Sequence, residues 1–377
     1  MFGFANFLLL ALFAAAVFDL IFALARGSGL RGALHGLWNT PHLLFGQQLA
    51  EWRLQLGRIL FAAGLAAYEI SVVFCNSMAR QNWAWVQGVM SPVLEWLAFL
   101  CFGAKILFGT RYTWRELLAG GALYFIARWV YFNSQNIWWI GIVVAVLAAK
   151  DVPLRRPLQV YFASGCAAMA VVLALHFAGI VAPDLTSERM GALRGTYGYG
   201  HPNTFGGLVF GLVLAYALLR AQKVRWVDCL LVFAVGVFLL VGPASRSAAL
   251  CTLALAVGLV FCRLRAGHSV PRWWPGTCAG MVGLTAAVSY LLPLLVIKVG
   301  PWNNDIGPAW LAKLDSLLTC RISLTWMAYR LLDVKIAGQV FNWPTVDNSF
   351  AFALFQFGPV VAALLLSLIH ISEPTRR

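Results

Sequence analysis

The residues with the most distinctive chemistry lie in a short glycine-rich stretch near the middle of the chain. It runs from Arg194 past three glycines to His201, Pro202 and Asn203, and an apolar run follows. Glycines allow positive φ angles and let a ligand approach the main chain closely. Because proline fits the first turn of a helix, we expect a helix to begin at Pro202. Its N-terminus, which carries partial positive charge and unpaired N–H groups, suits an anion.

Two further stretches place polar residues directly before an apolar run. Arg246 lies between Ser245 and Ser247 at the junction of two apolar runs, and Asp347 and Asn348 precede the last run. An arginine close to hydrocarbon is costly, so it is a functional-site hypothesis by default. Each of these stretches is also predicted to begin a helix.

Together these stretches predict an anion site of the kind that binds pyrophosphate. Arg194, Arg246 and Arg321 would donate paired hydrogen bonds to phosphate oxygens, and three helix N-termini would add their dipoles. Asn203 and Asn348 stand beside two of these termini and are predicted to bind the same substrate.

A transfer reaction at such a site needs a base for the attacking hydroxyl, and His201 and Asp347 are the candidates. A leaving pyrophosphate carries the developing charge, which arginines and helix dipoles can stabilise without a metal. We therefore expect no metal and no cofactor. The sequence has no Asp-x-Asp motif of metal-dependent nucleotide-sugar transferases, which agrees with a lipid-linked donor.

Structural roles could also explain these residues. Ser245 and Asp347 are ordinary N-cap residue types, and His201 could simply cap its helix. Arg246 could extend toward the membrane interface. The glycines could form no more than a turn between two membrane helices.

The composition indicates an all-α polytopic membrane protein. The chain is 61% hydrophobic and 11% charged, with a mean hydropathy of +0.78. Apolar runs of the ~17–25 residues that span a bilayer recur along it. The net charge of +14 does not indicate a nucleic-acid partner, because the basic residues form no continuous stripe. The eight cysteines lie almost all in apolar runs without C-x-x-C spacing, so neither a disulfide framework nor a zinc site is expected.

The apolar runs predict eleven transmembrane helices in one integral membrane domain, residues 1–366. They are placed at about 3–25, 59–78, 92–109, 116–133, 135–149, 158–182, 202–219, 228–244, 247–263, 276–298 and 349–370.

The loop charges predict the orientation of these helices. One alternate set of loops holds 16 lysines and arginines, whereas the short loops of the other set, with the adjoining helix ends, hold 5. The positive-inside rule then places the N-terminus outside and the glycine-rich stretch at the outer face. One long outer loop, about 299–348, precedes the last helix, and within it 306–332 is expected to be helical and partly amphipathic.

The end of the chain is unusual. Residues 367–377 look like translated adapter or cloning sequence, and we expect the native chain to continue after about residue 366 with further apolar helices.

Four motifs occur in order along the second half of the chain. They are Arg194-Gly-Thr-Tyr-Gly-Tyr-Gly-His-Pro-Asn, Ser245-Arg246-Ser-Ala, Leu314-Asp-Ser-Leu-Leu-Thr-Cys-Arg321-Ile, and Val346-Asp-Asn-Ser-Phe350 with Phe357-Gly358. Over roughly residues 160–365 the chain thereby resembles the Wzy-type polysaccharide polymerases of the O-antigen polymerase and ligase superfamily. Relatives often have a glycine before the loop arginine, where this chain has Cys320.

The resemblance implies a metal-independent glycosyltransferase in the cytoplasmic membrane of a bacterium, with its active site facing outside. Such an enzyme moves a growing glycan from undecaprenyl pyrophosphate onto the next lipid-linked repeat unit. The implied partners are undecaprenyl-pyrophosphate-linked oligosaccharides, membrane lipids, a chain-length regulator and a flippase.

Two other functions fit the sequence. An O-antigen ligase performs the same chemistry on a lipid A acceptor, and its specificity would lie in the acceptor pocket. A flippase or other transporter would place its arginines in a cavity open to both faces. The acids Asp19, Glu69 and Glu95 in or near apolar runs could then mark a proton path.

Overall fold

The computed structural model describes residues 51–181, 187–189, 192–265, 274–296, 308–318, 320–341, 346 and 349–371, besides three isolated positions before residue 51. Over these residues the fold is almost entirely helical, as the composition predicts, and one small hairpin supplies the β structure. The first predicted span, 3–25, lies almost wholly outside the described residues.

The chain divides into two compact units. Unit 1 comprises residues 1–120 and 144–268, and unit 2 comprises residues 121–143 and 269–377. The single integral membrane domain over residues 1–366 stays a prediction.

In the part of unit 1 that the structure describes, there are six long helices and several short elements. The long helices are α3 (Glu51–Cys75), α5 (Ser91–Phe108), α8 (Arg155–Phe177), α9 (Pro202–Arg220), α10 (Trp226–Val241) and α11 (Arg246–Leu264). The short elements are α4 (Ala79–Asn82), the π-helical turn η1 (Val86–Met90), the 3₁₀ turn η2 (Ala221–Lys223) and the strands β1 (Ser187–Arg189) and β2 (Ala192–Arg194).

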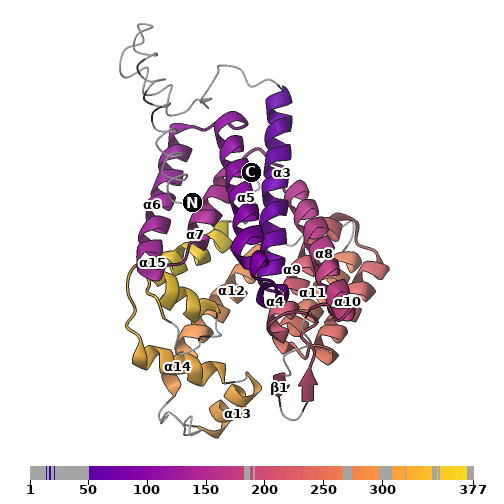
Figure 1. Cartoon of the computed structure of the whole chain (residues 1–377). Helices are drawn as coiled ribbons and strands as arrows, with labels where there is room; N and C mark the ends of the chain where they lie inside the picture. The colour runs from indigo at the N-terminus through magenta and orange to yellow at the C-terminus, as the bar shows by residue number, and fades with distance from the viewer. Residues whose placement is uncertain are drawn as a thin grey trace. The chain divides into compact units, whose positions relative to one another are not determined.

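The helices of unit 1 pack as a row of neighbours. α3 packs against α5 and α8, α8 packs against α9, and α11 packs against both α9 and α10 (Figure 1). Their facing sides form an apolar cluster that includes Val73, Val172, Phe205 and Leu239. Many large apolar side chains also point away from the protein, which is expected where lipid rather than water covers a helix.

Five helical segments in the described residues are long and apolar enough to cross a membrane. They are Glu51–Cys75, Val86–Phe108, Arg155–Phe177, Pro202–Lys223 and Arg246–Leu264. These helices are compatible with a multi-pass membrane protein. A helix also overlaps each of the other predicted spans from the fourth onward, but the total of eleven crossings and the sidedness stay predictions.

Two helices cross the boundary between the units in sequence. α6 (Trp114–Ser134) and α7 (Trp138–Ala148) are separated at Gln135, whose φ is +55°. The helical break therefore falls where Asn133-Ser134-Gln135-Asn136 interrupts the apolar run.

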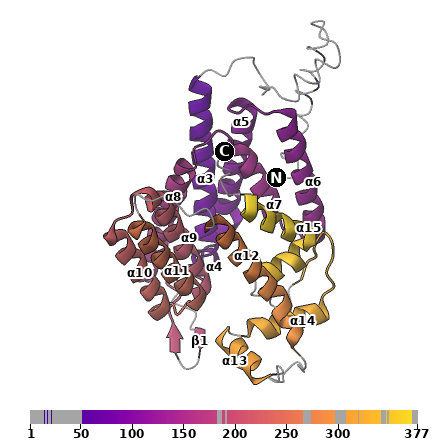
Figure 2. The ribbon, with the colours of Figure 1, turned by 180° about the vertical axis from the view of Figure 1, so that it is seen from behind.

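Unit 2 continues with α12 (Trp274–Leu291), the 3₁₀ turn η3 (Leu292–Leu295), α13 (Ala309–Leu317), α14 (Arg321–Leu331) and α15 (Ser349–Ile371), which Figure 2 shows from behind. α12 packs against α15, and the Tyr290 hydroxyl donates a hydrogen bond to the carbonyl of Phe350 at 3.1 Å. α15 is kinked at Gly358, where Pro359 follows.

The helical stretch predicted over 306–332 is in fact two helices. Cys320 adopts the left-handed conformation with φ +63°, which no continuous helix contains. The fully buried Asp315 of α13 accepts hydrogen bonds from the N–H groups of Ile322 and Ser323 at 2.7 and 3.2 Å. Its carboxylate therefore takes the place of an N-cap for α14, which stabilises the break.

Candidate functional site

Segments distant in sequence meet at one end of unit 1. The Met78 N–H, just after α3, donates to the carbonyl of Gly198 at 2.8 Å, and Ser77 forms an antiparallel bridge with Tyr199. The hairpin of β1 and β2 lies at the same end, close to α10 and α11 in both views (Figures 1 and 2). This end also carries the N-termini of α9 and α11, as the geometry of Arg194 shows.

The glycine-rich stretch connects the hairpin to α9. β1 and β2 pair antiparallel, with Ser187 opposite Arg194, so the hairpin delivers the arginine to the start of the stretch. Gly198 has φ +82°, and an added Cβ would lie 3.0 Å from the Cβ of His176 on α8. Here the glycine is needed both for its backbone angle and for close packing.

Arg194 is clamped in place. The residue is only 6% exposed. Its Nε donates to the carbonyl of Pro243 at 3.3 Å, and its Nη2 donates to the carbonyl of Ala244 at 3.2 Å and to Oδ1 of Asn203 at 3.1 Å. The guanidinium therefore ties the start of α9 to the turn that precedes α11.

Asn203 and Ser245 complete this junction. Oδ1 of Asn203 also accepts a hydrogen bond from the hydroxyl of the buried Ser245 at 3.4 Å. The helices approach so closely that a Cβ added at Gly206 would collide with that hydroxyl. The N-termini of α9 and α11, and so the positive ends of their dipoles, are held side by side.

His201 is the N-cap of α9. Its Nδ1 accepts a hydrogen bond from the N–H of Asn203 at 3.1 Å. An accepting Nδ1 carries no proton, so the neutral imidazole carries its proton on Nε2. In this geometry Nε2 is the nitrogen able to donate, and His201 could take up a proton only at the nitrogen that caps the helix.

Arg246 is the first residue of α11 and its side chain is exposed. The preceding Ser245 makes no side-chain cap for α11. An exposed guanidinium beside two helix N-termini is well placed to hold a dense anion such as a phosphate.

Aromatic residues pack around the glycine-rich stretch. The ring of Tyr197 stacks on Phe205 at 5.0 Å between centroids and also contacts Phe238. Tyr199 is fully buried, and its hydroxyl has no hydrogen-bond partner among the described residues. Burial, aided by the carboxylate of Glu69, raises the pKa of Tyr199, so this hydroxyl stays protonated.

The other predicted arginine belongs to unit 2. Arg321 is the first residue of α14 and is half buried, and its Nε has no hydrogen-bond partner in the described part of the chain. Since Asp315 already satisfies the first N–H groups of α14, Arg321 itself is the group there that could still bind an anion.

The structure thus brings together Arg194, His201, Asn203 and Arg246 within unit 1. Asp347 and Asn348 lie outside the described residues. Their predicted roles as base and substrate-binding group stay predictions.

The described residues include no group of three or more His, Cys, Asp or Glu side chains that could hold a metal ion. This observation concerns protein ligands alone, and the absence of a metal from the reaction stays a prediction.

The sequence did not predict the turn whose carbonyls accept hydrogen bonds from Arg194. The carbonyls of Pro243 and Ala244 accept its hydrogen bonds, and Ala244 has φ +50°. Gly242-Pro243 was a visible turn signal, but main-chain acceptors leave no mark of their own in a sequence.

No family model, no curated protein and no solved structure matches the chain. The resemblance to the Wzy-type polymerases therefore rests on the four motifs.

Proposed function

We propose that this chain is a membrane glycosyltransferase that polymerises undecaprenyl-pyrophosphate-linked oligosaccharide repeat units. It acts at the outer face of a bacterial cytoplasmic membrane, with lipid-linked oligosaccharides as both donor and acceptor. A chain-length regulator and a flippase would be its protein partners.

One observation carries the proposal. Two helix N-termini are held side by side by Arg194, Asn203 and Ser245, and the exposed Arg246 lies directly beside them. The charge balance of the region favours an anion, because Asp228 is the only acidic residue between Glu188 and Asp305. Such a junction, at the end of apolar helices, would suit a diphosphate that is linked to a lipid.

In the proposed reaction, a hydroxyl oxygen of the acceptor sugar bonds to the anomeric carbon of the donor glycan. The bond from that carbon to the pyrophosphate oxygen breaks, and the lipid pyrophosphate leaves with the electron pair. Arg246 and the two helix dipoles stabilise the developing charge. The hydroxyl proton passes to a base, for which His201 and Asp347 are the candidates; taking it at Nδ1 would remove the hydrogen bond by which His201 caps α9.

Arg194 has a different role in this proposal from Arg246. It is buried and donates to Pro243, Ala244 and Asn203, so its proposed role is to position the glycine-rich stretch and Asn203. Arg246 is the group that would contact phosphate oxygens. Arg321 is proposed to bind the same class of anion.

Deletion in the producing organism tests the proposal. Without the gene, single lipid-linked repeats should accumulate on the outer leaflet and polymer should disappear. Repeats trapped at the inner leaflet would indicate a flippase, and finished polymer that is not attached to its acceptor would indicate a ligase. Either result would replace the proposed function.

Complementation of the deletion strain with variant genes then tests the site. Arg246→Ala should lower polymer yield about ten- to a hundredfold at normal membrane abundance, since each ~1.4 kcal/mol of lost stabilisation is a factor of ten. Arg246→Lys should restore only part of it, because an ammonium lacks the paired donors. Arg156→Ala, which removes another exposed arginine at the start of α8, is the matched control. Normal polymer from Arg246→Ala would show that the anion binds elsewhere.

A further inference from the structure

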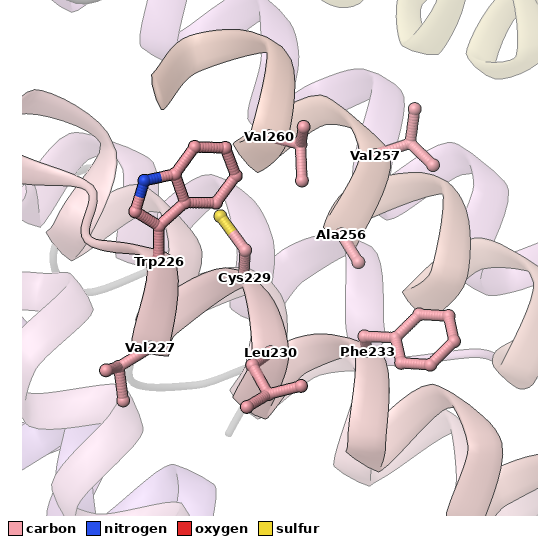
Figure 3. Close-up of a pocket in the computed structure, with 8 residues that line it drawn as sticks. All are labelled: Trp226, Val227, Cys229, Leu230, Phe233, Ala256, Val257 and Val260. Atoms are coloured by element: carbon pink, nitrogen blue, oxygen red, sulfur yellow. The ribbon is translucent and has the colours of Figure 1, made fainter. Parts of the chain in front are cut away.

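A second feature of unit 1 lies at the opposite ends of α10 and α11 from the junction described above. It is an apolar groove of about 530 Å³ between the two helices. Its floor is formed by the buried small residues Cys229 and Ala256. Figure 3 shows the Trp226 indole beside the sulfur of Cys229, with Val257 and Val260 on the facing helix.

The walls of the groove are apolar and exposed. Leu230 on α10 is 68% exposed and Val257 on α11 is 70% exposed. A volume within the roughly 300–1,000 Å³ of small-ligand pockets, with no polar wall, suits a hydrocarbon chain.

Basic residues surround the same end. Trp226 is the first residue of α10, and Arg225 precedes it; Val260 is followed by Arg263 within α11. Lys223, Arg225, Arg263 and Arg265 are all exposed. The buried cluster that joins Val224 and Cys229 to Ala256 and Leu259 shows that the start of α10 and the end of α11 lie together.

Asp228, the acid of α10 closest in sequence to the groove residue Cys229, does not repel an anion there. Asp228 accepts hydrogen bonds from the guanidinium of Arg220, from the hydroxyl of Tyr216 at 2.6 Å and from the N–H of Arg225 at 2.7 Å. Its charge is balanced by Arg220, with 3.2 Å between Nη2 and Oδ2. Within the residues that the structure describes, Lys223, Arg225, Arg263 and Arg265 form no ion pair, so they leave a positive field at the mouth of the groove.

We propose that this groove is a binding site for an anionic glycerophospholipid. One acyl chain fills the groove between α10 and α11, and the phosphate is held by Arg225 and Arg263. The two observations that select this occupant are the apolar lining and the positive charge at the same end of the helices. The inference does not depend on the proposed glycosyltransferase activity.

The test is native mass spectrometry of the full chain in detergent, titrated with phosphatidylglycerol or phosphatidylcholine. The wild-type protein should retain phosphatidylglycerol preferentially. Each arginine near a lipid headgroup is expected to contribute about fivefold in affinity, so Arg225→Gln with Arg263→Gln should weaken phosphatidylglycerol binding roughly 25-fold. Arg155→Gln with Arg156→Gln makes the same charge change at the exposed start of α8 and should leave the affinity unchanged.

A second variant tests the groove itself. Val257→Trp adds a bulky side chain at an exposed wall position without changing charge, so it should weaken binding of both lipids. Val241→Trp, at the exposed far end of α10, should not. The proposal is overturned if both lipids bind the wild type equally, if the two double-arginine variants behave alike, or if Val257→Trp retains the lipid. It is also overturned if Val257→Trp converts a dimer to a monomer, because a second chain would then occupy the groove.

Discussion

Replacing Arg194 by alanine tests whether this residue is chiefly a structural clamp. Its guanidinium makes three hydrogen bonds to protein acceptors, and the residue as a whole is only 6% exposed. A hydrogen bond that involves a charged group contributes about 1.5–3 kcal/mol, and an acceptor left unsatisfied costs about 1–3 kcal/mol. Because such contributions are not additive, we expect Arg194→Ala to lower the free energy of unfolding by about 2–4 kcal/mol.

The assay is thermal unfolding of the purified protein in detergent, followed by the fluorescence of its 16 tryptophans. A loss of this size should lower the midpoint of unfolding by about 5–10 °C. Arg194→Lys should recover part of the loss, since one ammonium cannot reach all three acceptors. Arg246→Ala should change the free energy of unfolding by no more than about 0.5 kcal/mol, because that side chain is exposed.

A double-mutant cycle tests whether the loss of stability comes from the hydrogen bond between Arg194 and Asn203. Combining Arg194→Ala with Asn203→Ala should reveal a coupling energy of about 1.5–3 kcal/mol, since the two side chains share a hydrogen bond of 3.1 Å. A coupling near zero, together with a wild-type melting midpoint for Arg194→Ala, would refute the clamp and return Arg194 to a direct role in substrate binding.

Three further predictions concern stability and use the same unfolding assay. Gly206→Ala should lower the midpoint because its Cβ would collide with α11, whereas Gly207→Ala, which meets nothing within 4 Å, should not. Asp315→Ala should cost about 1–2 kcal/mol by removing the cap of α14, and the exposed Asp333→Ala is its control. Tyr199→Phe should leave stability unchanged or raise it, because it removes a buried hydroxyl that has no partner among the described residues; a marked loss would reveal an unseen partner.

The positions of the helices could be read from the sequence because they depend on local patterns. Apolar runs of bilayer length predicted both ends of α5, α6, α9 and α11 within two residues, whereas α3 begins at Glu51, eight residues before its predicted start. Pro202 begins α9 and Arg246 begins α11, as the proline and the change from polar to apolar residues indicated. His201 also caps its helix, which was one of the two interpretations open for it.

The partners of these residues depended on the tertiary structure. Arg194 binds carbonyls about fifty positions away, and a main-chain carbonyl is the same chemical group in every residue, so no pattern reveals it. The helical periodicity of the sequence did not predict the break at Cys320, for a related reason. A buried carboxylate from the preceding helix, Asp315, satisfies the first N–H groups of α14. A sequence records which side chains avoid water, but the partner of a buried hydrogen-bonding group is decided when distant segments pack together.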